Sequence, residues 1–263
     1  MYHEIYRSED RDFLGNLTNP AYNTEITLFK RQMAWLSSKR FKTLTLDELF
    51  SEKWDHGRNA VCLTFDDGWL GNYLYAYPVL NQYGFKATFF VATGLIGTPF
   101  YMTWEHLREM VATGMSVQSH TVTHQPLGGM GEAEIHSELS ESKMKIEERL
   151  GTKVYHMSLP HGTKNTRIWP LAKKMGYKSI STSDVGFQTP ENNGPWLKRI
   201  SIGDRVSMNQ FQRIAQGKNH AIFGMRASKG MKNMIRGLMG VNNYQKLYRR
   251  IYKTKFNNSI SIS

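Results

Sequence analysis

Two adjacent carboxylates at the end of an apolar strand constrain this chain more than any other feature. Residues 60–65 (Ala-Val-Cys-Leu-Thr-Phe) are typical of a buried strand, and Asp66, Asp67 and Gly68 follow directly. Carboxylates in such a position cost folding free energy unless a bound group or a partner uses them. Because side chains alternate along a strand, the two carboxylates cannot serve one purpose from one direction. The pattern therefore predicts that one holds a metal and the other faces a substrate.

A pair of histidines supplies matching ligands after a second short strand. The pattern of residues 115–119 predicts this second strand, and His120 and His124 follow it. Together with Asp67 they give two imidazoles and one carboxylate, a set suited to zinc or a similar divalent ion with a position left for water. Asp66 is then free to act as a general base for the water that the metal activates. Alone, Asp-Asp-Gly is more often a turn, and His-x-x-x-His is more often a pair of surface or core histidines; their combination at two strand ends favours the metal site.

A third segment, residues 158–162 (Ser-Leu-Pro-His-Gly), follows a strand-like stretch at residues 154–157. Pro160 and Gly162 flank His161 and predict a rigid turn. Such a turn can aim backbone N–H groups at a developing oxyanion. Taken alone, the segment indicates only a turn.

Together, the three segments resemble the polysaccharide deacetylase family, also called the NodB-homology family or carbohydrate esterase family four. The resemblance covers residues 1–215 and implies a distorted (β/α) barrel with fewer than eight regular strands. It also implies metal-dependent removal of N-acetyl, sometimes O-acetyl, groups from a glycan. By this resemblance Asp66 is the base, Asp67, His120 and His124 bind the metal, and the turn at residues 160–162 lies beside the oxyanion.

The chain departs from the family pattern in three places. Ser158 stands where many members have an arginine that orients the catalytic aspartate, and His161 stands where an aromatic residue is common. Arg199 is the candidate for the missing cation. Together with residues 160–162, it is expected to contact the substrate or the oxyanion. The late Leu-x-x-His motif that carries the general acid in many members has no convincing copy, since His220 lies in different surroundings. Either another residue protonates the leaving amine or turnover is slow.

The leading functional prediction is a metal-dependent deacetylase that removes N-acetyl groups from a bacterial surface polysaccharide or a lipid-linked glycan precursor. One alternative is a catalytically weakened barrel that binds glycans, motivated by Ser158 and the missing late histidine. Another is a hydrolase of a non-sugar amide. No nucleic-acid partner is expected, because the basic residues avoid the candidate site and no recognised motif accompanies them.

Strand and helix patterns alternate along the chain, which predicts parallel β/α units. In such barrels the functional site lies at the C-terminal ends of the strands, where the three segments fall. Helices are expected at residues 25–37, after Thr45 with Glu48 completing a capping box, and at residues 73–82, 103–114, 132–150 and 166–175. Further strands are expected at residues 86–93, 178–182 and 197–202.

The positive charge lies entirely in the last part of the chain. Residues 1–204 contain 22 Lys and Arg against 22 Asp and Glu, whereas residues 205–263 contain 12 Lys and Arg and no acid, which accounts for the net charge of +12. This asymmetry predicts two units, a barrel at residues 1–215 and a basic amphipathic tail at residues 216–263. Apolar residues recur at helical spacing on both sides of Gly240, which predicts two short helices.

Three interpretations of the tail remain open: the helices pack on the barrel, they lie on an anionic membrane surface through residues 225–255, or they bind nucleic acid or an acidic glycan. No apolar run is long enough to span a bilayer, and no secretory signal is visible at the start. The expected location is cytoplasmic or peripheral at the membrane. The opening Tyr2-His3 pair resembles the end of a longer strand, so the start is expected to be cropped.

Overall fold

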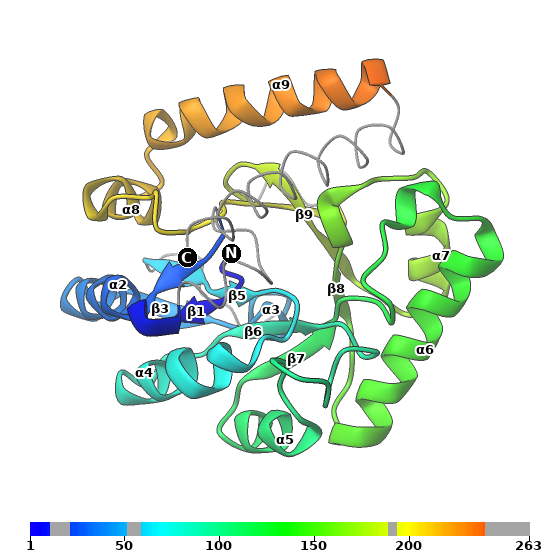
Figure 1. Ribbon diagram of the computed structural model, residues 1–263, viewed down its shortest axis with the longest axis horizontal. Coiled ribbons are helices and arrows are strands. Elements are labelled where there is room, and N and C mark those ends of the chain that lie inside the picture. The colour runs from blue at the N-terminus through cyan, green and yellow to red at the C-terminus, as the bar shows by residue number, and fades with distance from the viewer. Residues whose placement is uncertain (11–21, 52–58, 189–193, 240–263) are drawn as a thin grey trace, which may run out of the picture.

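A sheet of six parallel strands forms the centre of the molecule. The computed structural model describes residues 1–10, 22–51, 59–188 and 194–239. The strands lie side by side in the order β10-β9-β8-β7-β6-β5, and each pairs in parallel with its neighbours. The sheet curls into half a barrel with helices around its outside (Figure 1). The distorted (β/α) barrel implied by the resemblance is confirmed.

The strands are short, as expected for a barrel whose site lies at the strand ends. Those of the main sheet are β5 (Thr64–Phe65), β6 (Thr88–Val91), β7 (Ser116–Ser119), β8 (His156–Ser158), β9 (Ser179–Val185) and β10 (Trp196–Arg199). Two further parallel pairs join β1 (Ile5–Tyr6) to β2 (Thr24–Glu25), and β3 (Lys42–Leu44) to β4 (Ala60–Cys62).

The helices alternate with these strands along the chain. They are α2 (Ile26–Ser38), α3 (Leu46–Leu49), α4 (Tyr77–Gln82), α5 (Trp104–Ala112), α6 (Glu132–Leu150), α7 (Ile168–Lys174), α8 (Met208–Ala215) and α9 (Phe223–Met239).

Local sequence signals account for several helix ends. Thr45 caps α3, because its hydroxyl accepts from the backbone N–H of Glu48 at 3.1 Å and the Glu48 carboxylate accepts from the Thr45 N–H at 2.8 Å. Gly151 ends α6 with φ at 66°, a left-handed conformation that glycine adopts without strain. The helix expected at residues 73–82 differs from the prediction, because a π-helical turn (Asn72–Ala76) precedes α4.

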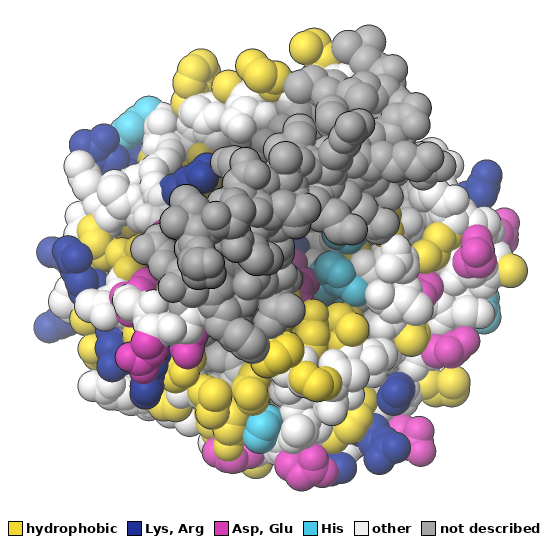
Figure 2. Space-filling model, in the orientation of Figure 1, with side chains coloured by type: hydrophobic (Ala, Val, Ile, Leu, Met, Phe, Trp, Pro, Cys, Tyr) yellow, Lys and Arg dark blue, Asp and Glu magenta, His cyan; other side chains and the backbone are white. Residues whose placement is uncertain are grey.

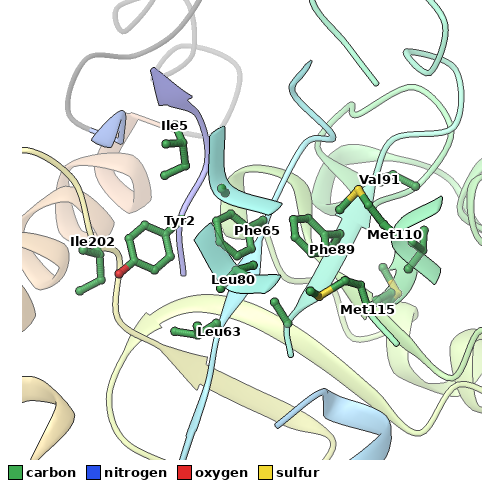
Figure 3. Packing of buried hydrophobic residues seen from close by; sticks show 14 of the residues in the cluster. Tyr2, Ile5, Leu63, Phe65, Leu80, Phe89, Val91, Met110, Met115 and Ile202 are labelled. Carbon is green, nitrogen blue, oxygen red and sulfur yellow. The ribbon is translucent and has the colours of Figure 1, made fainter. Parts of the chain in front are cut away.

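Aromatic rings fill the barrel interior beneath the carboxylates. Tyr2 stacks on Phe65 with ring centroids 5.3 Å apart, and Phe65 stacks on Phe89 at 4.7 Å (Figure 3). All three rings are fully buried, and the Tyr2 hydroxyl donates to Gln32 Oε1 at 2.8 Å. Burial of rings of this size contributes about 1.5–3 kcal/mol each. The strand that carries Asp66 is thus held rigidly from below.

The first residues of the chain also reach the site. Tyr2 pairs in parallel with Phe65, and its N–H donates to the Thr64 carbonyl at 2.7 Å. On the other side, the Ile202 N–H donates to the Met1 carbonyl at 2.9 Å. His3 therefore emerges beside the strand that ends in Asp66.

The C-terminal region begins with α8 and continues into α9. A helix is present where the first of the two predicted amphipathic helices was expected, and it starts earlier, at Phe223. The second, expected after Gly240, lies outside the described residues. Within the described ranges, we find no helix with the length and apolar character needed to cross a membrane.

Candidate active site

The turn after β5 separates the two aspartates. Asp66 continues the strand inward and is only 3% exposed. Asp67 adopts φ 75° and Gly68 φ 88°, so the chain reverses sharply after the first carboxylate. A Cβ on Gly68 would lie 3.1 Å from the Ile96 side chain, which adds a steric reason for glycine. The two carboxylates thus reach different surroundings, as the alternation of side chains predicts.

Asp67, His120 and His124 converge on one point. The Nε2 atoms of His120 and His124 lie 3.2 and 3.0 Å from Asp67 Oδ1. The three ligand atoms are within 4.8 Å of one another. The structure therefore brings together the three residues expected to bind a metal, although they come from two separate strand ends.

The donor set fits a divalent metal. Among the described residues no group donates a hydrogen bond to the buried Asp67 Oδ1, even though both imidazoles approach it. The other oxygen is held in place, since Trp69 Nε1 donates to Asp67 Oδ2 at 3.0 Å. Burial opposes ionisation of Asp67, but the imidazoles of His124 and His120 outweigh it and hold the pKa of this carboxyl well below its usual range. One carboxylate oxygen and two imidazole nitrogens that face one another at 3.0 to 3.2 Å form a ligand set for zinc or a related ion.

A second layer of contacts orients the histidines. His120 Nδ1 lies 2.8 Å from the Ser158 carbonyl oxygen, which places the proton on Nδ1 and leaves the Nε2 lone pair free. The loop that carries His124 is tied to α6 by Glu138, whose carboxylate accepts from the Val122 N–H at 2.7 Å and the Thr123 N–H at 3.0 Å. These contacts hold the loop although His124 itself has φ 59°. Glu138 is a positioning residue that the sequence analysis missed.

Asp66 is paired with Arg199. Arg199 Nη1 donates to Asp66 Oδ1 and Nη2 to Asp66 Oδ2, both at 2.7 Å. Nη2 also donates to Ser158 Oγ at 2.8 Å, and the Ser158 hydroxyl donates to Asp66 Oδ2 at 3.0 Å. The Thr182 carbonyl fixes the other end of the guanidinium by accepting from Arg199 Nε at 3.0 Å. The cation absent from position 158 thus reaches Asp66 from β10.

This pairing keeps Asp66 ionised. Burial raises the pKa of Asp66, but the charge of Arg199 more than compensates and brings the pKa to about 2. A buried, bidentate arginine–carboxylate pair is geometrically specific and strong. Asp66 is therefore a fixed carboxylate at neutral pH.

The third predicted segment forms a tight turn beside the histidines. Pro160 and Gly162 are buried, and His161 is exposed with φ 56°. The His161 ring lies 5.1 Å from the His124 ring, centroid to centroid. A Cβ on Gly162 would lie 2.7 Å from Ser183 Oγ, so the turn requires glycine. The turn is in place, and its oxyanion role stays a prediction.

The structure adds His3 and an aromatic wall to the site. His3 is half-buried, and its Nδ1 has no hydrogen-bond partner in the described ranges. Burial lowers the pKa of His3, while the nearby charges of Asp67 and Asp66 oppose the shift. Trp69 stacks on Tyr101 with ring centroids 4.5 Å apart. The Tyr2-His3 pair was the only sequence signal for His3, and no spacing rule indicated Tyr101.

Comparison with known sequences places the chain in one family. The sequence profile described as Polysaccharide deacetylase matches residues 53–180. The Bacillus subtilis (strain 168) protein named Putative polysaccharide deacetylase YxkH is 32% identical over 186 residues, which are 70% of this chain and 67% of the relative. The poly-beta-1,6-N-acetyl-D-glucosamine N-deacetylase of Staphylococcus aureus (strain MSSA476) is 28% identical over 199 residues, covering 70% of this chain and 69% of the relative.

A solved structure agrees with the sequence relatives. The Streptococcus pyogenes deacetylase PplD, in complex with acetate, matches with a TM-score of 0.74 and 28% identity, covering 83% of this chain and 96% of that chain. The matched range, residues 53–180, spans the carboxylates after β5, both histidines and the Pro-His-Gly turn of this chain. On its sequence, its fold and these relatives, the chain belongs to the polysaccharide deacetylase family, a family of hydrolases.

Proposed function

We propose that this protein is a metal-dependent N-deacetylase acting on an N-acetylglucosamine polysaccharide of a bacterial surface. The observation that carries the proposal is the convergence of Asp67, His120 and His124 beside a buried, ionised Asp66. The Staphylococcus aureus relative, named for poly-beta-1,6-N-acetyl-D-glucosamine, supports the substrate class.

The three converging residues would hold the metal, and zinc is the proposed ion because imidazole and carboxylate ligands suit it. When bound, such a metal supplies Lewis acidity toward the acetyl carbonyl and the attacking water. The protein prepares the site before the metal arrives: the Ser158 carbonyl sets the His120 tautomer, and Trp69 turns Asp67 Oδ1 toward the histidines.

Asp66 accepts a proton from the attacking water in this proposal. With a pKa of about 2 it is ionised at neutral pH but is a weak base. Its contribution therefore comes mainly from position, because Arg199 fixes the plane of the carboxylate through two hydrogen bonds. This is the role we propose for Arg199.

The departing amine needs a proton, and we assign its delivery to His3. Water adds to the carbonyl carbon, the C–N bond breaks, acetate leaves with the water oxygen, and the sugar nitrogen gains a proton. His3 has an unpartnered Nδ1 within the described residues and lies near both aspartates, so it can pass on the proton that Asp66 takes up. In this proposal His3 is the proton donor that the late histidine motif supplies in many members of the family.

Tyr101, backed by the buried Trp69, is the proposed contact for the sugar ring. The partly exposed Tyr101 ring presents the kind of apolar surface that ligand pockets use, and polar groups fix the orientation of the ligand. Burial and the charge of Asp67 raise the pKa of Tyr101 above its usual range, so it stays a neutral phenol.

The direct test is acetate release from poly-β-1,6-N-acetylglucosamine oligomers, with chitooligosaccharides as a second substrate. We expect release to stop when a chelator removes metal and to return when zinc is added. Glycan binding without acetate release by the zinc-loaded protein would favour the binding barrel instead. Release from a non-sugar acetamide at a higher kcat/KM would favour the amide hydrolase.

The role of His3 is tested against another imidazole of the site, that of His161, which lies beside His124. We expect His3→Gln to lower kcat by about 10²-fold or more while metal content is unchanged. His161→Gln is the matched control and should alter mainly KM, since it lies exposed at the rim. A His3→Gln variant with wild-type kcat contradicts the assignment.

A further inference from the structure

Helix α9 exposes apolar side chains that the fold does not cover. Phe223, Met231 and Met234 are 76%, 63% and 62% exposed. In the described part of the chain, Met144 on α6, at 64%, is the only other large apolar side chain exposed to this degree. Scattered exposed apolar residues are ordinary, but a set gathered on one helix is typical of an interaction surface.

These side chains lie along one face of the helix. At helical spacing Phe223, Ala227, Met231 and Met234 fall within an arc of about 80°. The opposite side of α9 faces the protein, where Met225 packs against the hydrophobic core, and Arg226, beside the apolar face, donates from Nε to the Val185 carbonyl at 3.3 Å. α9 runs along the upper edge of the molecule in Figure 1, and Figure 2 shows apolar side chains along the same edge.

The helix that carries this apolar face has charge of one sign. α9 contains Arg226, Lys229, Lys232 and Arg236 and no acidic residue. No acid occurs anywhere in residues 205–263, whereas residues 1–204 are neutral overall. A partner that covers the apolar face therefore meets a strongly positive segment, which requires a negatively charged surface.

We propose that α9 docks the protein onto an anionic lipid bilayer, with its apolar face at the level of the headgroups. An amphipathic helix with an apolar stripe, basic residues and no spanning length is the element that lies in a membrane interface. Cationic residues near such a surface strengthen binding by about fivefold each at ordinary salt. An anionic bilayer can bury the apolar face of α9 and also attract its positive charge. This proposal does not rest on the proposed catalysis.

The test is co-sedimentation of the full chain with phosphatidylcholine vesicles that contain or lack phosphatidylglycerol. We expect binding only to the anionic vesicles, and loss of that binding at about 1 M salt, where the Debye length is about 3 Å. The double variant Met231→Ser/Met234→Ser should bind at least about tenfold more weakly. The matched control is Met144→Ser, which removes an equally exposed methionine from α6 and should bind like the wild type.

A second pair of variants separates charge from apolar contact. Lys232→Glu/Arg236→Glu should weaken binding to anionic vesicles by at least about 25-fold. The proposal is overturned if the wild-type protein does not co-sediment with anionic vesicles. It is also overturned if the Met231→Ser/Met234→Ser variant binds them as well as the wild type does. Concentration-dependent dimerisation that this variant abolishes, without vesicle binding by the wild type, would assign the face to a second copy instead. Circular dichroism and thermal melting of each variant establish that it is folded.

Discussion

Replacing Arg199 removes the cation on which the position of Asp66 depends. The guanidinium makes two 2.7 Å hydrogen bonds to a carboxylate that is 3% exposed, so Arg199→Met leaves a buried charge without its partner. Breaking a buried pair from one side costs about 3–5 kcal/mol. For a protein of this size, about 2–4 °C per kcal/mol gives a fall in Tm of about 6 to 20 °C.

The expected loss of stability in Arg199→Met comes from the Asp66 carboxylate, which stays buried without its cation. Adding Asp66→Asn to Arg199→Met removes the stranded charge, so the double variant should recover most of the lost stability. Urea unfolding of the wild type, both single variants and the double variant gives the coupling free energy directly. A loss below about 1 kcal/mol in Arg199→Met refutes the reasoning, because the pair would then be worth no more than an exposed salt bridge.

Activity can be recovered by moving the cation. Ser158 Oγ lies 2.8 Å from Arg199 Nη2, so an arginine at position 158 can reach the same carboxylate. We expect Arg199→Met to lower kcat by about 10²-fold and Ser158→Arg/Arg199→Met to restore at least part of it. Acetate release measured for both variants checks this, and a double variant no more active than Arg199→Met contradicts it.

Three further predictions concern the surroundings of the site. Glu138→Gln weakens the anchor of the His124 loop, so zinc affinity measured by calorimetry should fall about 10–100-fold; unchanged affinity contradicts this. Trp69→Phe keeps an aromatic ring but removes the donor to Asp67 Oδ2, so zinc affinity should fall, and equal affinity would show that the bond is dispensable. Burial raises the pKa of Glu4 well above 4.5, so the wild type loses stability as pH rises above that value. Glu4→Gln does not titrate, and its advantage in unfolding free energy should grow by up to about 1.4 kcal/mol per pH unit. Urea unfolding at about pH 5 and about pH 7 tests the sign, and a constant difference refutes it.

The features predicted correctly are those encoded by neighbouring residues. The capping box of Thr45 and Glu48, the glycine end of α6 and the extended chain that leads into Asp66 each depend on a few adjacent positions. The one strand expected at residues 60–65 is divided in the structure into β4, which pairs with β3, and β5, which pairs with β6. The convergence of the carboxylates with His120 and His124 followed from one further rule, that parallel strands of a barrel end at the same edge.

What sequence reasoning missed depends on the curl of the sheet, which brings its two edge strands near each other. Asp66 and Arg199 are 133 positions apart, and only the approach of β10 to β5 brings them together. Arg199 could be named as a candidate cation, but neither its bidentate geometry nor the link through Ser158 could be derived from spacing. His3 and Glu138 likewise reach the site through tertiary contacts that leave no periodic signal in the sequence.

Metal content and acetate release, determined on the same preparations of the wild type and Asp66→Asn, test the central claim most directly. The proposed mechanism predicts that both proteins hold one metal ion per chain, because Asp67, His120 and His124 are intact in each. It also predicts that acetate release falls by about 10³-fold or more in Asp66→Asn. An Asp66→Asn variant that releases acetate at the wild-type rate, or a wild type that remains active after a chelator has removed all its metal, would contradict the claim.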